Sequence, residues 1–262
     1  MVVGVAIVLY EFGFLSGGGG EVVSSFYVRP RALYYDPLWR EYPNETLVDL
    51  VVSNLEAAGY VVDVYKGSEA GLFELESMDA YKVVIIRGHG AYNNDSSIGK
   101  PSGPYLFTGL LMEEAEEKYG GRVDYMLLKG QAAPGIVPPG GPLVPLSEEE
   151  LEILPRYLAV SVEFFKVTPL FFNDTVILYG PCYGLGDTEE DYSLAETLLS
   201  KGAKAFAGFQ GLVTWPHADA AIALFTEKLA ETGDPVKALL EVQETLPPDP
   251  YTGAKLEVVV RS

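Results

Sequence analysis

Apolar runs and helical stretches alternate through the first half of this chain. Residues 31–35 (RALYY) predict a buried strand, and residues 60–65 (YVVDVY) predict a second one. Between them lies a helix that Asn44 caps and Gly59 ends. A third apolar run, YKVVIIRGHG at residues 81–90, follows a short helical stretch. Strands that alternate with helices predict an α/β fold with a mainly parallel sheet and right-handed crossovers.

The second half continues this alternation around one irregular stretch. Residues 130–146 are so rich in Pro and Gly that we expect a long loop there, with neither helix nor central strand. The pattern elsewhere predicts strands at residues 104–109, 123–128, 157–165, 175–180 and 204–211, and helices at 110–121, 147–154, 193–203, 217–233 and 234–246. We therefore expect a single α/β domain over residues 29–262.

Residues 1–28 form a segment of different character. Residues 2–16 are almost all apolar, and the spacer GGGG follows them. The segment is either the remnant of a membrane anchor or signal segment, or a plain edge strand. Acceptor patterns for glycosylation begin at Asn44, Asn94 and Asn173. These signals lean towards an extracellular or membrane-anchored protein rather than a cytoplasmic one, without fixing the compartment, and any membrane contact is expected through this segment.

Charge and composition narrow the classes of partner. Lys and Arg number 18 against 37 Asp and Glu, a net charge of −19, which repels nucleic acid and favours basic partners. The single cysteine, Cys182, excludes an intrachain disulfide and a thiolate metal cluster. With only His89 and His217 besides, we expect no metal site and no cofactor.

Cys182 and His89 are the candidate reactive residues, because each ends an apolar run. The run TVILYGPC ends on Cys182, and VVIIRGH ends on His89. Ligands of open α/β sheets bind at the carboxyl ends of the strands, so a thiol and an imidazole there predict a nucleophile and its base. Taken alone, Cys182 is also compatible with a buried small apolar residue and His89 with an ordinary loop histidine.

This pairing resembles the cysteine peptidases of the caspase-haemoglobinase fold, which include caspases, gingipains and CHAT domains. The stretch from KGAKAFAGFQG to ALLEVQETL is similar to the C-terminal part of CHAT-like and gingipain-like members, and the DPYTGAKL tail is similar to that of uncharacterised archaeal proteins. The resemblance runs from about Arg31 to the C-terminus. It implies a three-layer α-β-α sandwich, a cysteine endopeptidase, and a peptide or protein substrate. Carried over, Cys182 is the nucleophile, His89 assists departure of the amine, and the backbone N–H groups of Gly90 and Cys182 bind the oxyanion.

Further residues follow strands at the same edge and are candidates for supporting roles. Asp36, at the end of the first strand, is a candidate to orient His89, although a turn aspartate before proline is also ordinary. The candidates for the walls of a substrate pocket are Asp187, Gln210, Trp215 and Asp219. An acidic pair would suit a basic substrate side chain, whereas Asp187 and Asp219 are also typical of helix starts.

Two other functions remain open at this point. Residues 180–184 (GPCYG) fit the G-x-C-x-G pattern of a nucleophile elbow, in which His217 and Asp219 would supply base and orienter for a hydrolase or amidotransferase-like enzyme. A binding or surface module that keeps the fold without catalysis is the other alternative. The two enzyme predictions differ in which histidine serves Cys182.

Overall fold

The computed structural model describes residues 29–93, 101–138, 147–187 and 191–262. The expected anchor or edge strand at residues 1–28 lies outside these ranges, as do residues 139–146 of the Pro/Gly-rich stretch. All structural statements below concern the described residues.

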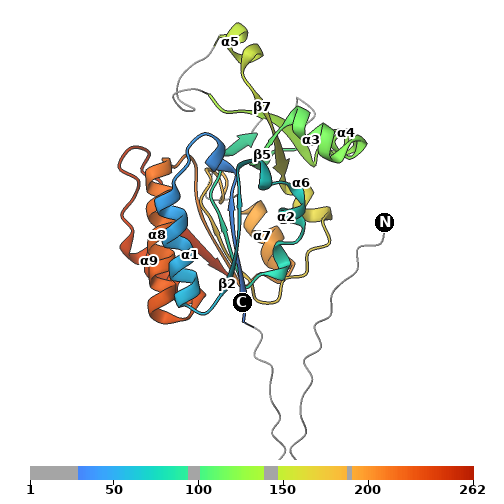
Figure 1. The fold of residues 1–262 in the computed structure, drawn as a ribbon. Coiled ribbons are helices and arrows are strands. Elements are labelled where there is room, and N and C mark those ends of the chain that lie inside the picture. The colour runs from blue at the N-terminus through green and yellow to red at the C-terminus, as the bar shows by residue number, and fades with distance from the viewer. Residues whose placement is uncertain (1–28, 94–100, 139–146, 188–190) are drawn as a thin grey trace, which may run out of the picture.

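A six-stranded sheet forms the centre of the molecule (Figure 1). Its strands are β1 (Arg31–Asp36), β2 (Val61–Lys66), β3 (Val83–Ile86), β8 (Val176–Tyr179), β9 (Ala205–Phe209) and β10 (Leu256–Val260). They lie in the order β10-β9-β8-β3-β1-β2, parallel except for β10, which runs antiparallel to β9. The central strands are buried on both faces, and this explains why their sequences are continuously apolar.

Helices cover both faces of this sheet, as a three-layer α-β-α sandwich requires (Figure 1). One face carries α1 (Glu45–Ala57), α8 (Trp215–Thr232) and α9 (Pro235–Thr245), and the other carries α2 (Leu72–Glu76), α6 (Val162–Val167) and α7 (Ser193–Ser200). Short 3-10 helices join the elements: η1 (Pro37–Arg40), η2 (Gly67–Glu69) and η3 (Met78–Ala80). The expected caps are confirmed, since the Asn44 side chain accepts from Leu47 N–H at 3.1 Å and Asp234 caps α9.

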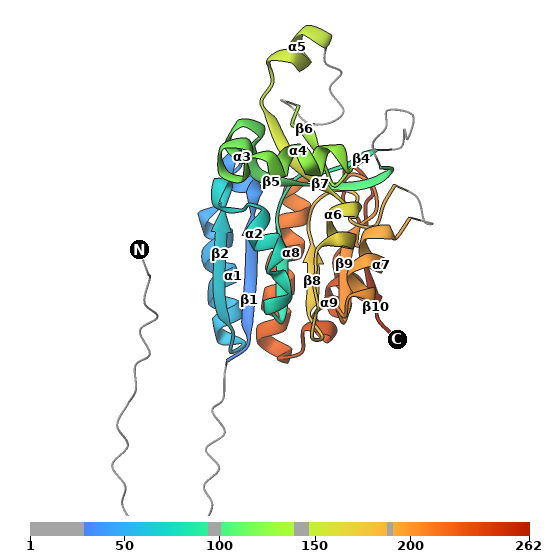
Figure 2. The ribbon, with the colours of Figure 1, turned by 90° about the vertical axis from the view of Figure 1, so that its right-hand side faces the viewer.

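A second, four-stranded antiparallel sheet lies across the carboxyl edge of the first (Figure 2). Its strands are β4 (Gly90–Asn93), β5 (Gly103–Leu111), β6 (Ala132–Ile136) and β7 (Arg156–Ser161), in the order β4-β5-β7-β6. The helices α3 (Met112–Tyr119), α4 (Gly121–Leu128) and α5 (Glu148–Ile153) belong to the same region. Because β4 begins at Gly90, this sheet starts at the candidate site.

The structure corrects four expectations about elements. Residues 123–128 are helix α4, not a strand, and the expected strand at 157–165 divides into β7 and α6 at Ser161, whose hydroxyl caps the helix. The Pro-rich stretch contains strand β6. This strand tolerates Pro134, which has no N–H to donate, because β6 lies at the edge of its sheet. The antiparallel edge strand β10 was not expected.

Candidate active site

His89 and Cys182 leave neighbouring strands at the same edge of the six-stranded sheet. β3 and β8 run parallel side by side, with Ile86 paired to Tyr179 at their carboxyl ends. His89 and Cys182 each lie three residues beyond that pair. Because parallel strands end at one edge, the imidazole and the thiol emerge at matched positions.

Gly90 brings the two chain segments into direct contact. A Cβ atom on Gly90 would overlap the carbonyl oxygen of Cys182 and lie 3.0 Å from the Cys182 nitrogen, so only glycine permits this approach. Phe107 N–H donates to the His89 carbonyl at 3.1 Å, which makes Gly90 and Leu106 a non-hydrogen-bonded pair of the β4–β5 ladder. The N–H of Gly90 therefore lies outside that ladder.

Both residues line one small cavity of about 20 Å³. Its apolar walls include Leu38 from η1, Val213 from the β9–α8 loop and Trp215 at the start of α8. The thiol and the imidazole thus share one confined, mostly apolar space.

The Cys182 sulfur lies against the backbone of Val213. The thiol donates to the Val213 carbonyl and accepts from the Val213 N–H, both at 3.4 Å. Burial raises the pKa of the thiol, and these hydrogen bonds do not offset that effect. The resting sulfur is therefore a protonated thiol at neutral pH. Tyr183, the next residue, has a φ of 61°, which turns the chain sharply after the cysteine.

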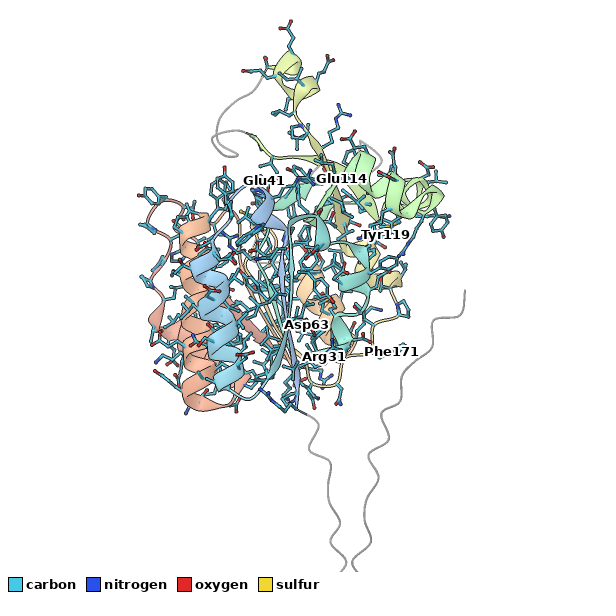
Figure 3. All side chains as sticks on the ribbon, in the orientation of Figure 1. Arg31, Glu41, Asp63, Glu114, Tyr119 and Phe171 are labelled. Carbon is cyan, nitrogen blue, oxygen red and sulfur yellow. The ribbon has the colours of Figure 1, made fainter. Side chains whose placement is uncertain are left out.

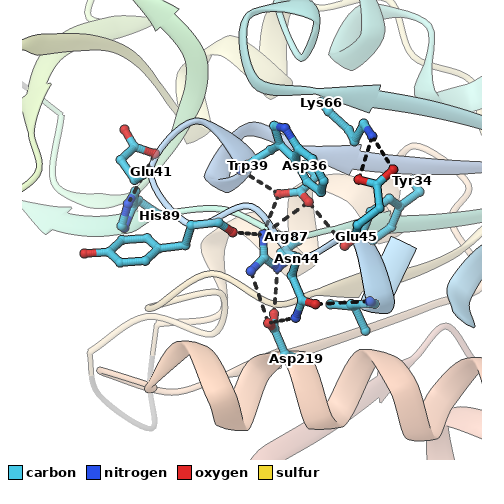
Figure 4. A network of polar contacts seen from close by, with 12 residues as sticks. Tyr34, Asp36, Trp39, Glu41, Asn44, Glu45, Lys66, Arg87, His89 and Asp219 are labelled. Carbon is cyan, nitrogen blue, oxygen red and sulfur yellow. Dashed lines mark hydrogen bonds and ion pairs between the residues drawn. The ribbon is translucent and has the colours of Figure 1, made fainter. Parts of the chain in front are cut away.

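The imidazole of His89 is largely buried, 16% exposed, among aromatic rings and faces Glu41 (Figure 4). The rings of Trp215 and Phe107 stand edge-on to it, with centroids 5.9 and 6.0 Å away. Nε2 of His89 has no hydrogen-bond partner and lies 4.0 Å from Oε2 of Glu41, whose Oε1 is also unpartnered. Burial, and then the positive charge of Arg87, lowers the pKa of His89 to about 4. The imidazole is therefore neutral at neutral pH.

Arg87, which lines the cavity, joins several chain segments (Figure 4). Its guanidinium donates to Asp36 at 3.0 and 3.2 Å and to Asp219 at 2.6 and 3.1 Å. It also donates to the Tyr42 carbonyl at 3.1 Å, and the Asn44 amide donates to Asp219 at 3.0 Å. The side chains of Arg87 and Asp36 are 3% and 0% exposed, so each charge depends on the other for compensation.

This network corrects the expected role of Asp36. Its carboxylate accepts from Arg87 and from Trp39 N–H at 3.0 Å, rather than from His89. Burial raises the pKa of Asp36 to about 6, against the attraction of Arg87. The carboxylate that faces His89 belongs to Glu41, five residues further along the chain.

The structure separates the four expected pocket residues. Trp215 and Asp219 line the cavity, whereas Gln210 and Asp187 are not among its lining residues, and Asp187 is exposed. Asp219 is already paired with Arg87. The expected acidic pair is therefore not free to bind a basic substrate side chain.

His217 is buried in the core against Phe209. It is 8% exposed, and its ring stands edge-on to Phe209 at 5.7 Å. Asp219 lies two positions along α8 and so on another face of the helix, where Arg87 binds it. The geometry does not form the His217 and Asp219 pair that the nucleophile elbow would need.

Two residues of the site escaped the sequence reasoning. Arg87 had a signal, since it is a charged residue directly after the apolar run of β3, where a buried charge demands partners. Glu41 had none, because no motif connects the end of η1 with a histidine 48 residues later.

Comparison with known proteins adds no assignment. No protein-family model matches the chain, and no curated protein matches it either. Among the described residues, no three His, Cys, Asp or Glu side chains form a group that could hold a metal ion. In the same ranges, no helix combines the length and apolar character that crossing a membrane requires.

Proposed function

We propose that this protein is a cysteine endopeptidase of the caspase-haemoglobinase type, with Cys182 as the nucleophile and His89 as the residue that transfers protons. One observation carries the proposal. The two residues follow paired parallel strands at equal offsets, and Gly90 packs on the Cys182 backbone beside a shared cavity. Acyl transfer needs a thiol, an imidazole and a backbone N–H in one place, and the two adjacent strands bring these three groups together.

Attack begins from a neutral pair. With His89 unprotonated and Cys182 a thiol, the thiol proton passes to the imidazole as the sulfur bonds to the substrate carbonyl carbon. The carbonyl electrons move to oxygen, and the N–H groups of Gly90 and Cys182 stabilise this oxyanion. Glu41 faces the imidazole and stabilises the positive charge that His89 acquires.

Collapse of the intermediate completes the first half of the reaction. The C–N bond breaks, and the leaving amine takes its proton from His89. Water then attacks the thioester between the acyl group and Cys182, gives a proton to His89, and releases the carboxylic acid as the proton returns to the sulfur. The protein ends in the state in which it began.

The cavity favours a small uncharged side chain at the cleaved bond. Its lining is mostly apolar, its volume is about 20 Å³, and the two charged residues that line it, Arg87 and Asp219, are paired with each other. A basic substrate side chain would have to displace Arg87 from Asp219 and so take a charged partner away from a buried guanidinium, which is costly. This replaces the basic preference that Asp187 and Asp219 suggested.

A fluorogenic peptide library tests the proposal. We expect hydrolysis after small uncharged residues, complete loss in Cys182→Ala, and a loss of at least about 100-fold in His89→Ala. His217→Ala should keep activity, because His217 faces Phe209. Loss in His217→Ala with activity kept in His89→Ala would overturn the proposal in favour of the nucleophile elbow.

One observation favours the second candidate, a non-catalytic binding module. The Cys182 sulfur is hydrogen-bonded to both the carbonyl and the N–H of Val213, as a structural cysteine would be. No hydrolysis of any peptide, together with a Cys182→Ala variant that is less stable than the wild type, would select this candidate.

A further inference from the structure

Asp249 is a buried carboxylate in the turn that precedes β10, distant in sequence from every residue of the proposed mechanism. It is 2% exposed. Its Oδ1 accepts from the N–H groups of Tyr251 at 2.8 Å and Thr252 at 3.3 Å, which closes the turn. Its Oδ2 accepts from the N–H of Thr214 at 2.7 Å and from the Thr214 hydroxyl at 2.8 Å. Asp249 therefore joins the C-terminal tail to the β9–α8 loop.

These bonds keep Asp249 charged although it is buried. Burial raises the pKa of a carboxyl group, but the four hydrogen bonds outweigh burial and hold the pKa of Asp249 below its usual value. A charged acceptor forms stronger hydrogen bonds than a neutral one, so the link to Thr214 is firm.

The Thr214 side chain binds Asp249 and does not cap helix α8. It is the N-cap residue of α8, and its carbonyl accepts from His217 and Ala218 N–H. A threonine at this position usually caps the helix with its hydroxyl, yet the Thr214 side chain makes no cap hydrogen bond. The hydroxyl binds Asp249 instead, so this side chain connects the β9–α8 loop to Asp249 rather than capping α8.

The link reaches Cys182 through one planar peptide unit. The N–H of Thr214, which Asp249 holds, and the C=O of Val213, which accepts from the Cys182 thiol, belong to the same peptide group. Because that group is rigid, fixing one end fixes the direction of the other. The buried carboxylate is therefore connected to the sulfur by two hydrogen bonds with one peptide group between them.

From this geometry we infer that Asp249 is a positioning residue for Cys182, acting through the Val213–Thr214 peptide. The C-terminal tail is thereby part of the active site. The role of Asp249 in catalysis rests on the proposed function, whereas its hold on the sulfur does not.

Asp249→Asn tests the inference with two readouts. An Asn can keep the turn through its oxygen, but it then presents an amide N–H to the Thr214 N–H, and the link breaks. We expect alkylation of Cys182 by iodoacetamide to become at least about 10-fold faster, because Val213 no longer covers the sulfur. The kcat for peptide hydrolysis should fall at least about 10-fold, with KM changed by less than about threefold.

A second pair of variants guards against a folding defect. Thr214→Val replaces the hydroxyl with a methyl group and keeps the backbone N–H that binds Asp249, so it should shift both readouts in the same directions by a smaller factor. Thr214→Ser should match the wild type. Asp234→Asn is the matched control, because Asp234 also accepts from two backbone N–H groups but at the start of α9. It should leave both readouts unchanged.

The two readouts separate the two claims. Unchanged alkylation of folded Asp249→Asn and Thr214→Val would overturn the positioning role, whatever the activity. Faster alkylation in a protein whose wild type hydrolyses no peptide would support the hold on the sulfur and reject the peptidase.

Discussion

At the residue scale, burial holds both reactive side chains in their neutral forms. It raises the pKa of the Cys182 thiol and lowers that of His89 to about 4. A preformed thiolate and imidazolium pair is therefore disfavoured, and proton transfer accompanies the attack on the substrate. The free protein should consequently react slowly with simple alkylating agents at neutral pH.

Replacing His89 with Gln should weaken the dependence of stability on pH between 6.5 and about 4. The pKa of His89 is about 4 when folded against an ordinary 6.5, so the unfolded chain binds the proton first and wild-type stability falls as pH drops through this window. At pH 4.5 this loss amounts to about 2.5 kcal/mol relative to pH 7. Urea unfolding at both pH values measures it.

The comparison with wild type isolates His89. Asp36, whose pKa burial raises to about 6, contributes with the opposite sign in both proteins and cancels. If the two proteins lose equal stability between pH 7 and 4.5, His89 is not held neutral.

Glu41→Gln should lower kcat by about tenfold and leave KM nearly unchanged. The amide keeps the shape of Glu41 but cannot stabilise the charge that His89 acquires, 4.0 Å away. Glu45→Gln is the control, because Glu45 is an exposed glutamate paired with Lys66 at 3.3 Å. Steady-state kinetics on one peptide compare the three proteins, and equal kcat values for Glu41→Gln and wild type would refute this role.

At the element scale, the start of β4 decides whether the two strand ends can meet. β4 begins at Gly90, which presses on the Cys182 backbone, so the second sheet and the β8 loop share one contact. A bulkier residue would separate the N–H groups that the proposed oxyanion site needs.

Gly90→Ala should lower kcat/KM at least about 100-fold and destabilise the fold by about 1–3 kcal/mol. Gly121→Ala, at the start of α4 where a Cβ meets open space, should change neither by a measurable amount. Kinetics and urea unfolding of both variants provide the check, and an active Gly90→Ala would contradict the oxyanion assignment.

Elements with strong local signals were predictable from sequence. The Asn44 and Asp234 caps and the buried runs of β3 and β8 have one local solution. Residues 123–128 were not predictable in this way, because their short apolar pattern suits a strand and a helix alike. Only the burial of Val123 and Met126 on one face selects helix α4. β10 depends on pairing with β9, about 50 residues away, which local patterns do not encode.

At the scale of the whole molecule, Arg87 ties distant parts of the chain together. It is on the segment after β3 and binds carboxylates on β1 and α8. The site therefore depends on the complete packing of the sheet against α8, and its chemistry and stability are coupled.

Arg87→Met should reduce the free energy of unfolding by about 3–5 kcal/mol, because it leaves the fully buried carboxylate of Asp36 without its charged partner and also removes the partner of the partly buried Asp219. Arg31→Met is the control. Arg31 and Asp63 form an exposed pair at the opposite end of the sheet (Figure 3), so the loss there should stay below about 1 kcal/mol. Urea unfolding compares them, and similar losses would show that the buried network contributes little.

The candidate site was predictable only where it lies at strand ends. Cys182 and His89 end apolar runs, and a parallel sheet brings such ends together. Glu41 and Asp249 act on residues far away in sequence, His89 and Thr214, so their roles follow from the assembled fold. For the same reason the sequence predicted Asp36, not Glu41, as the residue that orients His89. That Asp36 binds Arg87 instead is a tertiary contact, which the local sequence does not encode.

The most direct test of the proposed cysteine peptidase is covalent capture. A peptidyl acyloxymethyl ketone with a small uncharged residue next to the warhead is mixed with wild type, Cys182→Ala and His89→Ala, and intact mass is recorded. We expect one adduct on Cys182 in the wild type and none in either variant, because capture needs both recognition and His89. An unlabelled wild type, or a His89→Ala variant labelled as fast as the wild type, would contradict it.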